Sequence, residues 1–174
     1  MKAIKFFAIA ILFSGVSVMS SAQNTATSES VNAAANIISP LGITSTGSLN
    51  FGTLVSMATS YTATVGTDAN RTLSNDNAAK VGGIASTVTV PTFNVTGDSN
   101  AKFSITLPVS TSLTTTSGGE TATMTVDNFV HNAGISPKLD SGAASFKVGA
   151  TLNVGNAQKA GSYTGTFTVT VAYQ

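Results

Sequence analysis

Few side chains in this sequence could do chemistry. The chain has one histidine, His131, and no cysteine. A cysteine–histidine pair is therefore impossible, and a transition metal would lack the thiolate ligands that it favours. A serine–histidine–aspartate triad cannot be rejected by counting, but no serine lies in the Gly-x-Ser-x-Gly turn that exposes such a nucleophile. We interpret His131 as a loop histidine on a hydroxyl-rich surface.

The acidic residues do not form a recognisable constellation either. A glycosidase needs two carboxyl groups across one sugar bond, and no two acids here are close enough in sequence to suggest such a pair. Loops could bring Asp76 and Asp98 together, although nothing in the sequence indicates it. The seven acids are Glu29, Asp68, Asp76, Asp98, Glu120, Asp127 and Asp140.

Two short runs offer oxygen ligands for calcium. They are Asp68-Ala69-Asn70 and Asn75-Asp76-Asn77, and both lack the spacing of a dedicated calcium loop. Turn formation by aspartate and asparagine explains them more simply. The sequence thus predicts no catalytic residue, no metal site and no cofactor, and we expect that the protein is not an enzyme.

The N-terminus is typical of a secretory signal peptide. Lys2 and Lys5 precede the apolar run 6–18, and Ser20-Ser21-Ala22 supplies a small-residue cleavage site. The run is shorter than the roughly 20 residues of a membrane-spanning helix. We expect residues 1–22 to be a signal peptide, no membrane span after its cleavage, and a secreted product located in the periplasm, at the cell surface or outside the cell.

The net charge of the chain restricts the kinds of partner that it can bind. Removal of Lys2 and Lys5 leaves six basic and seven acidic residues, a net charge of −1. Nucleic-acid binding requires a basic patch, so we exclude it. Without cysteine, the fold must be held by burial of apolar residues, for which about 150 residues suffice.

Downstream of a polar arm at 23–32, apolar and polar residues alternate in short segments separated by glycine and asparagine turns. This period of two predicts strands. The arm leads into a weakly alternating stretch that Pro40 and Gly42 interrupt, which indicates an edge or kinked strand. The register changes at Pro91-Thr92, which predicts a bulge or bend. The expected strands are 49–51, 61–65, 88–95, 101–107, 122–126, 146–154 and 162–174.

The final segment has the cleanest alternation in the chain. Between 162 and 174 one face is apolar and aromatic, and the other is almost entirely threonine. Together these patterns predict an all-β fold: one antiparallel, immunoglobulin-like β-sandwich of about eight or nine short strands, formed by residues 33–174.

Gly161 and the penultimate residue, Tyr173, are spaced as in the C-terminal signature of pilin subunits assembled by the chaperone–usher route, and the segment resembles that family. The resemblance implies a sandwich lacking one strand, which a periplasmic chaperone and then the N-terminal arm of the next subunit fill by strand addition. It also implies an assembly strand with the residues Gly161, Tyr163, Phe167, Val169, Val171 and Tyr173.

The same resemblance implies inward-facing anchors on the arm. Those anchors would be Val31, Ala33, Ala35 and Ile37. The chain departs from the pilin pattern in two respects: it cannot form the disulfide that many pilins have, and two of the four anchors are alanines, which bury little surface.

A second resemblance covers most of the chain. The run 35–43, Leu49-Asn50-Phe51-Gly52, the run 146–152 and Gly161-Ser162-Tyr163-Thr164-Gly165 are similar to the bacterial domain-of-unknown-function 4402 family. That resemblance implies an exported, sandwich-like domain and no known activity.

We therefore expect a structural domain of the cell surface, a pilin-like subunit that assembles or attaches by β-strand addition. Its partner would be another copy, a homologous subunit or a periplasmic chaperone. The alternative is a self-complete adhesin or glycan-binding module whose loops recognise a surface.

Overall fold

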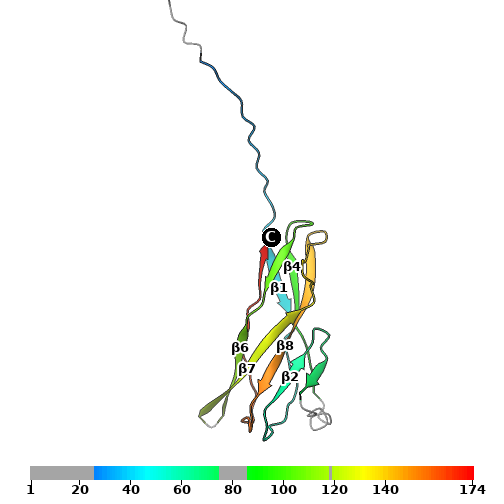
Figure 1. Ribbon diagram of the computed structural model, residues 1–174, viewed down its shortest axis with the longest axis vertical. Helices are drawn as coiled ribbons and strands as arrows, with labels where there is room; N and C mark the ends of the chain where they lie inside the picture. The colour runs from blue at the N-terminus through cyan, green and yellow to red at the C-terminus, as the bar shows by residue number, and fades with distance from the viewer. Residues whose placement is uncertain (1–25, 75–85, 118) are drawn as a thin grey trace, which may run out of the picture. The chain divides into compact units, whose positions relative to one another are not determined.

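The computed structural model describes residues 26–74, 86–117 and 119–174, and these residues contain nine strands and no helix (Figure 1). Every strand pairing is antiparallel, which confirms the predicted all-β sandwich. An immunoglobulin-like topology stays a prediction. The strands are β1 (Gly42–Thr46), β2 (Tyr61–Val65), β3 (Arg71–Leu73), β4 (Thr92–Thr96), β5 (Phe103–Thr106), β6 (Ser110–Ser117), β7 (Glu120–His131), β8 (Ala143–Val154) and β9 (Thr170–Tyr173).

The strand β8 organises the larger, seven-stranded sheet. Its first half pairs with β4 and its second half with β2, while β7 pairs with residues 148–153. Alternate side chains of β8, from Phe146 to Val154, are buried as the period of two predicts. β1 and β3 extend the sheet beyond β4 and β2, and β6 pairs with β7.

Two groups of buried side chains form the core, one behind each half of β8. The first contains Phe51, Tyr61, Val126 and Leu152, together with small residues of β2 and β8. The second contains Phe93, Val95, Phe103, Leu139, Phe146 and Val148. Phe129 packs against both groups and so links them. The smaller sheet, β5 with β9, covers the second group and forms the other layer of the sandwich.

The register change at Pro91-Thr92 coincides with the boundary between the two groups. Val88 and Val90 pack against the first group, whereas Phe93 and Val95 lie in the second. The change of parity thus moves the segment's inward side chains from one group to the other, and the bulge or bend expected at Pro91-Thr92 stays a prediction.

Several strand predictions were wrong in extent. The segment 162–174 is a strand only at 170–173, with one isolated bridge at Thr164. Leu49 to Phe51 forms one bridge, Asn50 with Thr89, instead of a strand. β1, β3 and β6 were missed because their sequences are short or rich in threonine and serine without clear alternation.

The chain divides into two compact units, residues 1–36 and residues 37–174, and the second contains all nine strands. In the first unit, residues 26–36 are exposed and form no strand, and residues 37 and 38 of the second unit form none either. The edge or kinked strand predicted before Pro40 is therefore wrong. The signal peptide, Asp76 and the run Asn75-Asp76-Asn77 lie outside the described residues. No helix long and apolar enough to span a membrane occurs among the described residues.

Candidate strand-binding groove

A groove of mixed polar and apolar lining lies between two segments from opposite ends of the 37–174 unit. One wall is residues 45–56, which begin at the end of β1, and the other is residues 158–167, which precede β9. Both segments are described throughout, and no backbone hydrogen bond joins them. Beyond the end of β1 each segment has one backbone bridge, Asn50 with Thr89 and Thr164 with Thr114, so most of its backbone groups are outside the sheets. Segments with free backbone groups are where a strand could be added.

The floor of the groove is the first core group. Two adjoining pockets, of about 410 Å³ and 240 Å³, share Leu49, Phe51 and Leu113, which therefore stand between them. We call these three residues the waist. The larger pocket also reaches Met124, Leu152 and Val154, and the smaller one reaches Phe93, Val126 and Phe167. Phe51, Val126 and Leu152 are themselves buried, and the partly exposed apolar side chains in the groove are Leu49, Leu113, Met124 and Phe167.

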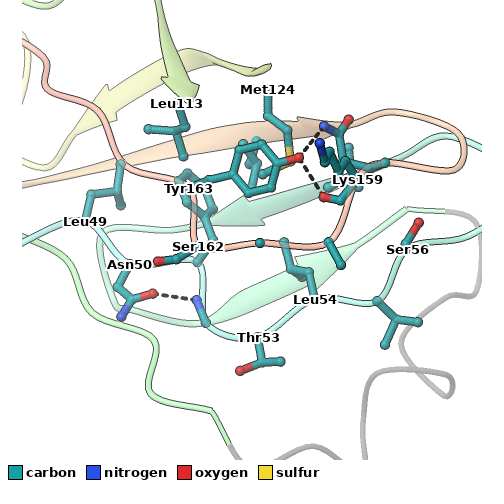
Figure 2. A pocket seen from close by; sticks show the side chains of 18 residues that line it. Leu49, Asn50, Thr53, Leu54, Ser56, Leu113, Met124, Lys159, Ser162 and Tyr163 are labelled. Carbon is teal, nitrogen blue, oxygen red and sulfur yellow. Dashed lines mark hydrogen bonds between the residues drawn. The ribbon is translucent and has the colours of Figure 1, made fainter. Parts of the chain in front are cut away.

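Tyr163 stands at the centre of the larger pocket (Figure 2). Its hydroxyl donates to the Lys159 carbonyl at 2.7 Å and accepts from the Gln158 amide at 2.8 Å. The same Gln158 side chain accepts from the Gly155 N–H and donates to the Thr123 carbonyl. This network holds the loop 155–163 closed beside the pocket, so that wall is shaped before anything binds.

Side chains of β2 and β3 hold the opposite wall, residues 45–56, in place. The Arg71 guanidinium donates to the carbonyls of Phe51, at 2.7 Å, and Thr53, at 3.0 Å. The Tyr61 hydroxyl donates to the Val55 carbonyl at 2.8 Å. Burial raises the pKa of Tyr61, which keeps this donor protonated. Three carbonyls of this wall are thus satisfied by side chains and need no neighbouring strand. The wall is not uniformly extended, because Gly47 and Gly52 have positive φ angles of 78° and 74°.

Two glycines allow the C-terminal wall to lie close against β6. A Cβ atom on Gly161 would come within 2.6 Å of the Thr115 hydroxyl, and one on Gly165 would collide with the Ser112 carbonyl. Thr114 and Thr164 exchange two backbone hydrogen bonds, at 2.8 and 2.9 Å, and these form the only bridge between this wall and β6 in the described residues. Gly161 is therefore explained by packing, whatever its place in a pilin signature.

The remaining predicted assembly residues point into the domain. Phe167, Val169, Val171 and Tyr173 are half-buried against the second core group. The Tyr173 hydroxyl donates to the Ser39 carbonyl at 2.8 Å and accepts from the Asp98 N–H at 2.7 Å. It thereby holds the start of the 37–174 unit to the end of β9.

The predicted arm anchors are all exposed. Val31 has 87 % and Ile37 has 94 % of its surface accessible, and Ala33 and Ala35 are exposed as well. An extended, apolar segment without partners and a groove therefore occur in the same chain. Sequence reasoning found the arm and the C-terminal wall. It missed the wall at 45–56. The only sign of this wall in the sequence is that the alternation of apolar and polar residues stops after Phe51.

The residues that could do chemistry have structural roles where they are described. The His131 Nδ1 atom accepts from the Ala133 N–H, and its ring packs edge-on against Phe146. Asp68 accepts hydrogen bonds from the backbone and side chain of Asn70, which lower the pKa of its carboxyl group. Within the described residues no three histidine or acidic side chains form a group that could hold a metal ion.

Fold and site together define an antiparallel β-sandwich domain with a groove between residues 45–56 and 158–167. The family model described as "Domain of unknown function (DUF4402)" matches residues 41–173. The chain therefore belongs to this family, as its sequence predicted. The search of curated proteins and the search of solved structures each found no match.

Proposed function

We propose that this protein is an exported structural subunit of the cell surface, whose groove accepts an extended segment as an added β-strand. The observation that carries the proposal is the groove itself, whose walls at 47–56 and 158–167 have one backbone bridge each, Asn50 with Thr89 and Thr164 with Thr114, and are not bonded to each other. A strand lying there would bond to the backbone of a wall and bury alternate side chains on the floor, which is the general chemistry of strand addition.

The chain carries a suitable segment. Residues 31–37 alternate between apolar anchors and polar or small residues, and they are exposed. Assembly of copies through this arm would give a fibre or surface coat of the pilin-like kind, with a homologous subunit or a periplasmic chaperone able to use the same groove. The net charge of −1 after signal cleavage and the hydroxyl-rich outer faces suit a location outside the cell.

The test is the assembly state of the secreted full chain on unheated and heated gels. The proposal expects a ladder that heating collapses to monomer, and deletion of residues 23–37 should abolish it. A double substitution, Val31→Asp with Ile37→Asp, should do the same. The matched control, Asn32→Asp with Asn36→Asp, adds the same charge on the opposite parity and should keep the ladder. A wild-type protein that is monomeric under all conditions would refute the proposal.

One observation favours a second function, glycan binding. A shallow depression of about 400 Å³ lies on the outer face of the larger sheet and is lined by Thr62, Thr123, Thr125, Asn153 and Gln158. Neutral hydroxyl and amide groups of this kind can hydrogen-bond to sugar hydroxyls. Binding of the arm-deleted protein to a glycan array, lost on Asn153→Ala, would support this function over strand-mediated assembly.

A further inference from the structure

Polar side chains cross the outer face of the larger sheet in two rows, with one residue from each strand. β6, β7, β8 and β2 lie side by side (Figure 1), and their registers align Ser112, Thr125, Asn153 and Thr62. We call this set the first row. The second row, two residues along each strand, is Ser110, Asp127, Thr151, Thr64 and, on β3, Thr72.

Both rows face away from the core. Val126 and Leu152, which lie between the rows in β7 and β8, are buried in the first core group, and successive side chains of a strand point to opposite faces. Neighbouring strands lie about 4.8 Å apart, so a row presents one polar group at that repeat over about 14–19 Å. A regular repeat of this kind suits a ligand that itself repeats.

The rows are almost free of charge. Asp127 is their one charged residue, and the others carry hydroxyl or amide groups. An anionic polymer would find no lysine or arginine in either row, and Asp127 would repel it. A protein partner would need an apolar or aromatic centre for its interface, and the rows have none. These side chains therefore fit an uncharged ligand rich in hydroxyl groups.

The centre of the rows is held in place before anything binds. The Asn153 amide donates to the Asp127 Oδ2 atom at 2.9 Å and to the Thr125 carbonyl at 3.3 Å. The Asn128 amide donates to the other carboxylate oxygen of Asp127 at 3.0 Å. Both amide hydrogens of Asn153 are thus used, and its side-chain carbonyl is left to accept a hydrogen bond from a ligand.

Affinity on this face must come from several sugars at once. In the described part of the chain, the three hydroxyl groups of the first row have no hydrogen-bond partner on the protein, so they are available to a ligand. The rows have no aromatic side chain on which a single sugar could stack. A hydrogen bond between neutral groups contributes little by itself, so a ligand gains affinity by contacting several strands.

From the register, the neutrality and the fixed centre we infer that this face binds an extended, uncharged polysaccharide, which lies across the strands along the rows. The inference rests on the second proposed function, glycan binding. It adds the class of glycan, its direction on the sheet and Asp127 as the residue that rejects acidic chains. One sugar of an extended β-1,4-linked chain is close in length to one strand spacing, so about three or four consecutive sugars contact one strand each. Adjacent strands are rotated by about 20–25°, so a flat crystalline surface would touch only part of the face.

Isothermal titration calorimetry of the full mature chain with defined oligosaccharides tests the inference. The neutral probes are cellohexaose and β-1,4-linked mannohexaose, each compared with its disaccharide. The acidic probes are the matching uronate hexamers, which have the same backbones with a carboxylate on every sugar. We expect a neutral hexamer to bind at least about 10-fold more tightly than its disaccharide, because the disaccharide contacts fewer strands. The uronate hexamer should not bind, and Asp127→Asn should let it bind.

Substitutions of threonine locate the ligand. Thr125→Val with Thr62→Val removes two hydroxyl groups of the first row and should weaken hexamer binding about 10-fold. The matched control, Thr106→Val with Thr170→Val, changes a cross-strand pair of the smaller sheet and should leave binding unchanged. Thr121→Val tests the direction, because Thr121 is exposed on the same strand as Thr125 but lies outside both rows. It should leave binding unchanged as well.

The opposite results would overturn the inference in distinguishable ways. Equal affinity for hexamer and disaccharide, or an equal loss on Thr121→Val and Thr125→Val, would overturn binding along the rows while glycan binding stands. Equal affinity for a neutral hexamer and its uronate would overturn the choice of an uncharged ligand and the role of Asp127. If neither neutral hexamer binds, the inference fails, and the glycan array decides separately whether glycan binding fails with it. None of these results bears on assembly through the groove.

Discussion

β8 and the C-terminal segment 162–173 have the same alternation of apolar and polar residues but differ in their backbone partners. β8 has β7 on one side and β2 or β4 as further partners. The C-terminal segment has a ladder with β5 only at 170–173 and one bridge at Thr164. In both, alternate side chains point inward. Alternation therefore determines which side chains are buried, whereas pairing depends on whether a neighbouring strand is present.

This difference in backbone pairing determines where the candidate site lies. The groove lies beside residues 158–167, which have only the bridge at Thr164, and Leu152 and Val154 of β8 line its floor. Four tests, from the largest expected effect to the smallest, would sharpen or break this contrast.

The largest effect is expected from Phe146→Ala in β8. Phe146 is 2 % exposed and stacks on Phe93 at 5.3 Å between ring centroids, so the loss should be about 3–5 kcal/mol of unfolding free energy. The matched substitution Phe167→Ala, at a half-buried residue of the C-terminal segment, should cost about 1–2 kcal/mol. Urea unfolding followed by circular dichroism measures both. Equal losses would show that the two segments contribute equally to the core.

The second largest effect is expected where alanine replaces a glycine in a crowded part of the backbone, and the stability loss should differ between β8 and the C-terminal segment. A Cβ atom on Gly149 of β8 would collide with the Val65 carbonyl, and Gly149→Ala should cost about 1–3 kcal/mol. Gly165→Ala collides with the Ser112 carbonyl, but its segment can move away from β6. We expect a smaller stability loss and faster amide hydrogen exchange confined to residues 161–169. Unchanged exchange there would contradict a loosely held wall.

Tyr173→Phe should lower stability by about 1–2 kcal/mol, because it removes the bond to Ser39 and leaves the Asp98 N–H without its partner. Thermal unfolding measures this loss. Tyr163→Phe is the control, since its hydroxyl bonds only within the loop 155–163. That variant should alter proteolysis of the loop more than the global unfolding temperature. The reverse result would place the stabilising contact at the groove.

The smallest expected effect is on the stability of the protein at acidic pH. Hydrogen bonds from Asn70 lower the pKa of Asp68 in the folded protein. A depressed pKa means that the unfolded state binds the proton more readily, so this contribution is present above the ordinary aspartate pKa of about 3.9 and lost as pH falls through the lower folded-state value. Asp68→Asn should therefore show a slightly smaller drop in unfolding temperature between neutral and acidic pH than the wild type. An identical drop would show that the turn contributes nothing.

The sequence allowed good prediction where local pattern and burial coincide. Tyr61 to Val65 alternates and is a strand over those five residues, and Phe146 to Val154 lies wholly within β8. Prediction from the sequence failed for β6, because threonine and serine occupy both of its faces and the sequence does not show which face is buried. In the structure Leu113 and Thr115 point inward. The candidate site was half predicted: the arm and the aromatic face of the last segment were visible, and the opposite wall was not.

By itself the sequence determined the parity of the clearly alternating segments, the all-β class and the family, because alternation is a local property of an extended backbone. Only the tertiary structure decided which of those segments find partners. Leu49 and Phe167 are more than a hundred residues apart in the chain and line the same pocket. The groove is a gap between them, and the hydrogen bond from the Tyr173 hydroxyl to the Ser39 carbonyl joins the start of the 37–174 unit to its last strand. Both depend on long-range packing that no local pattern carries.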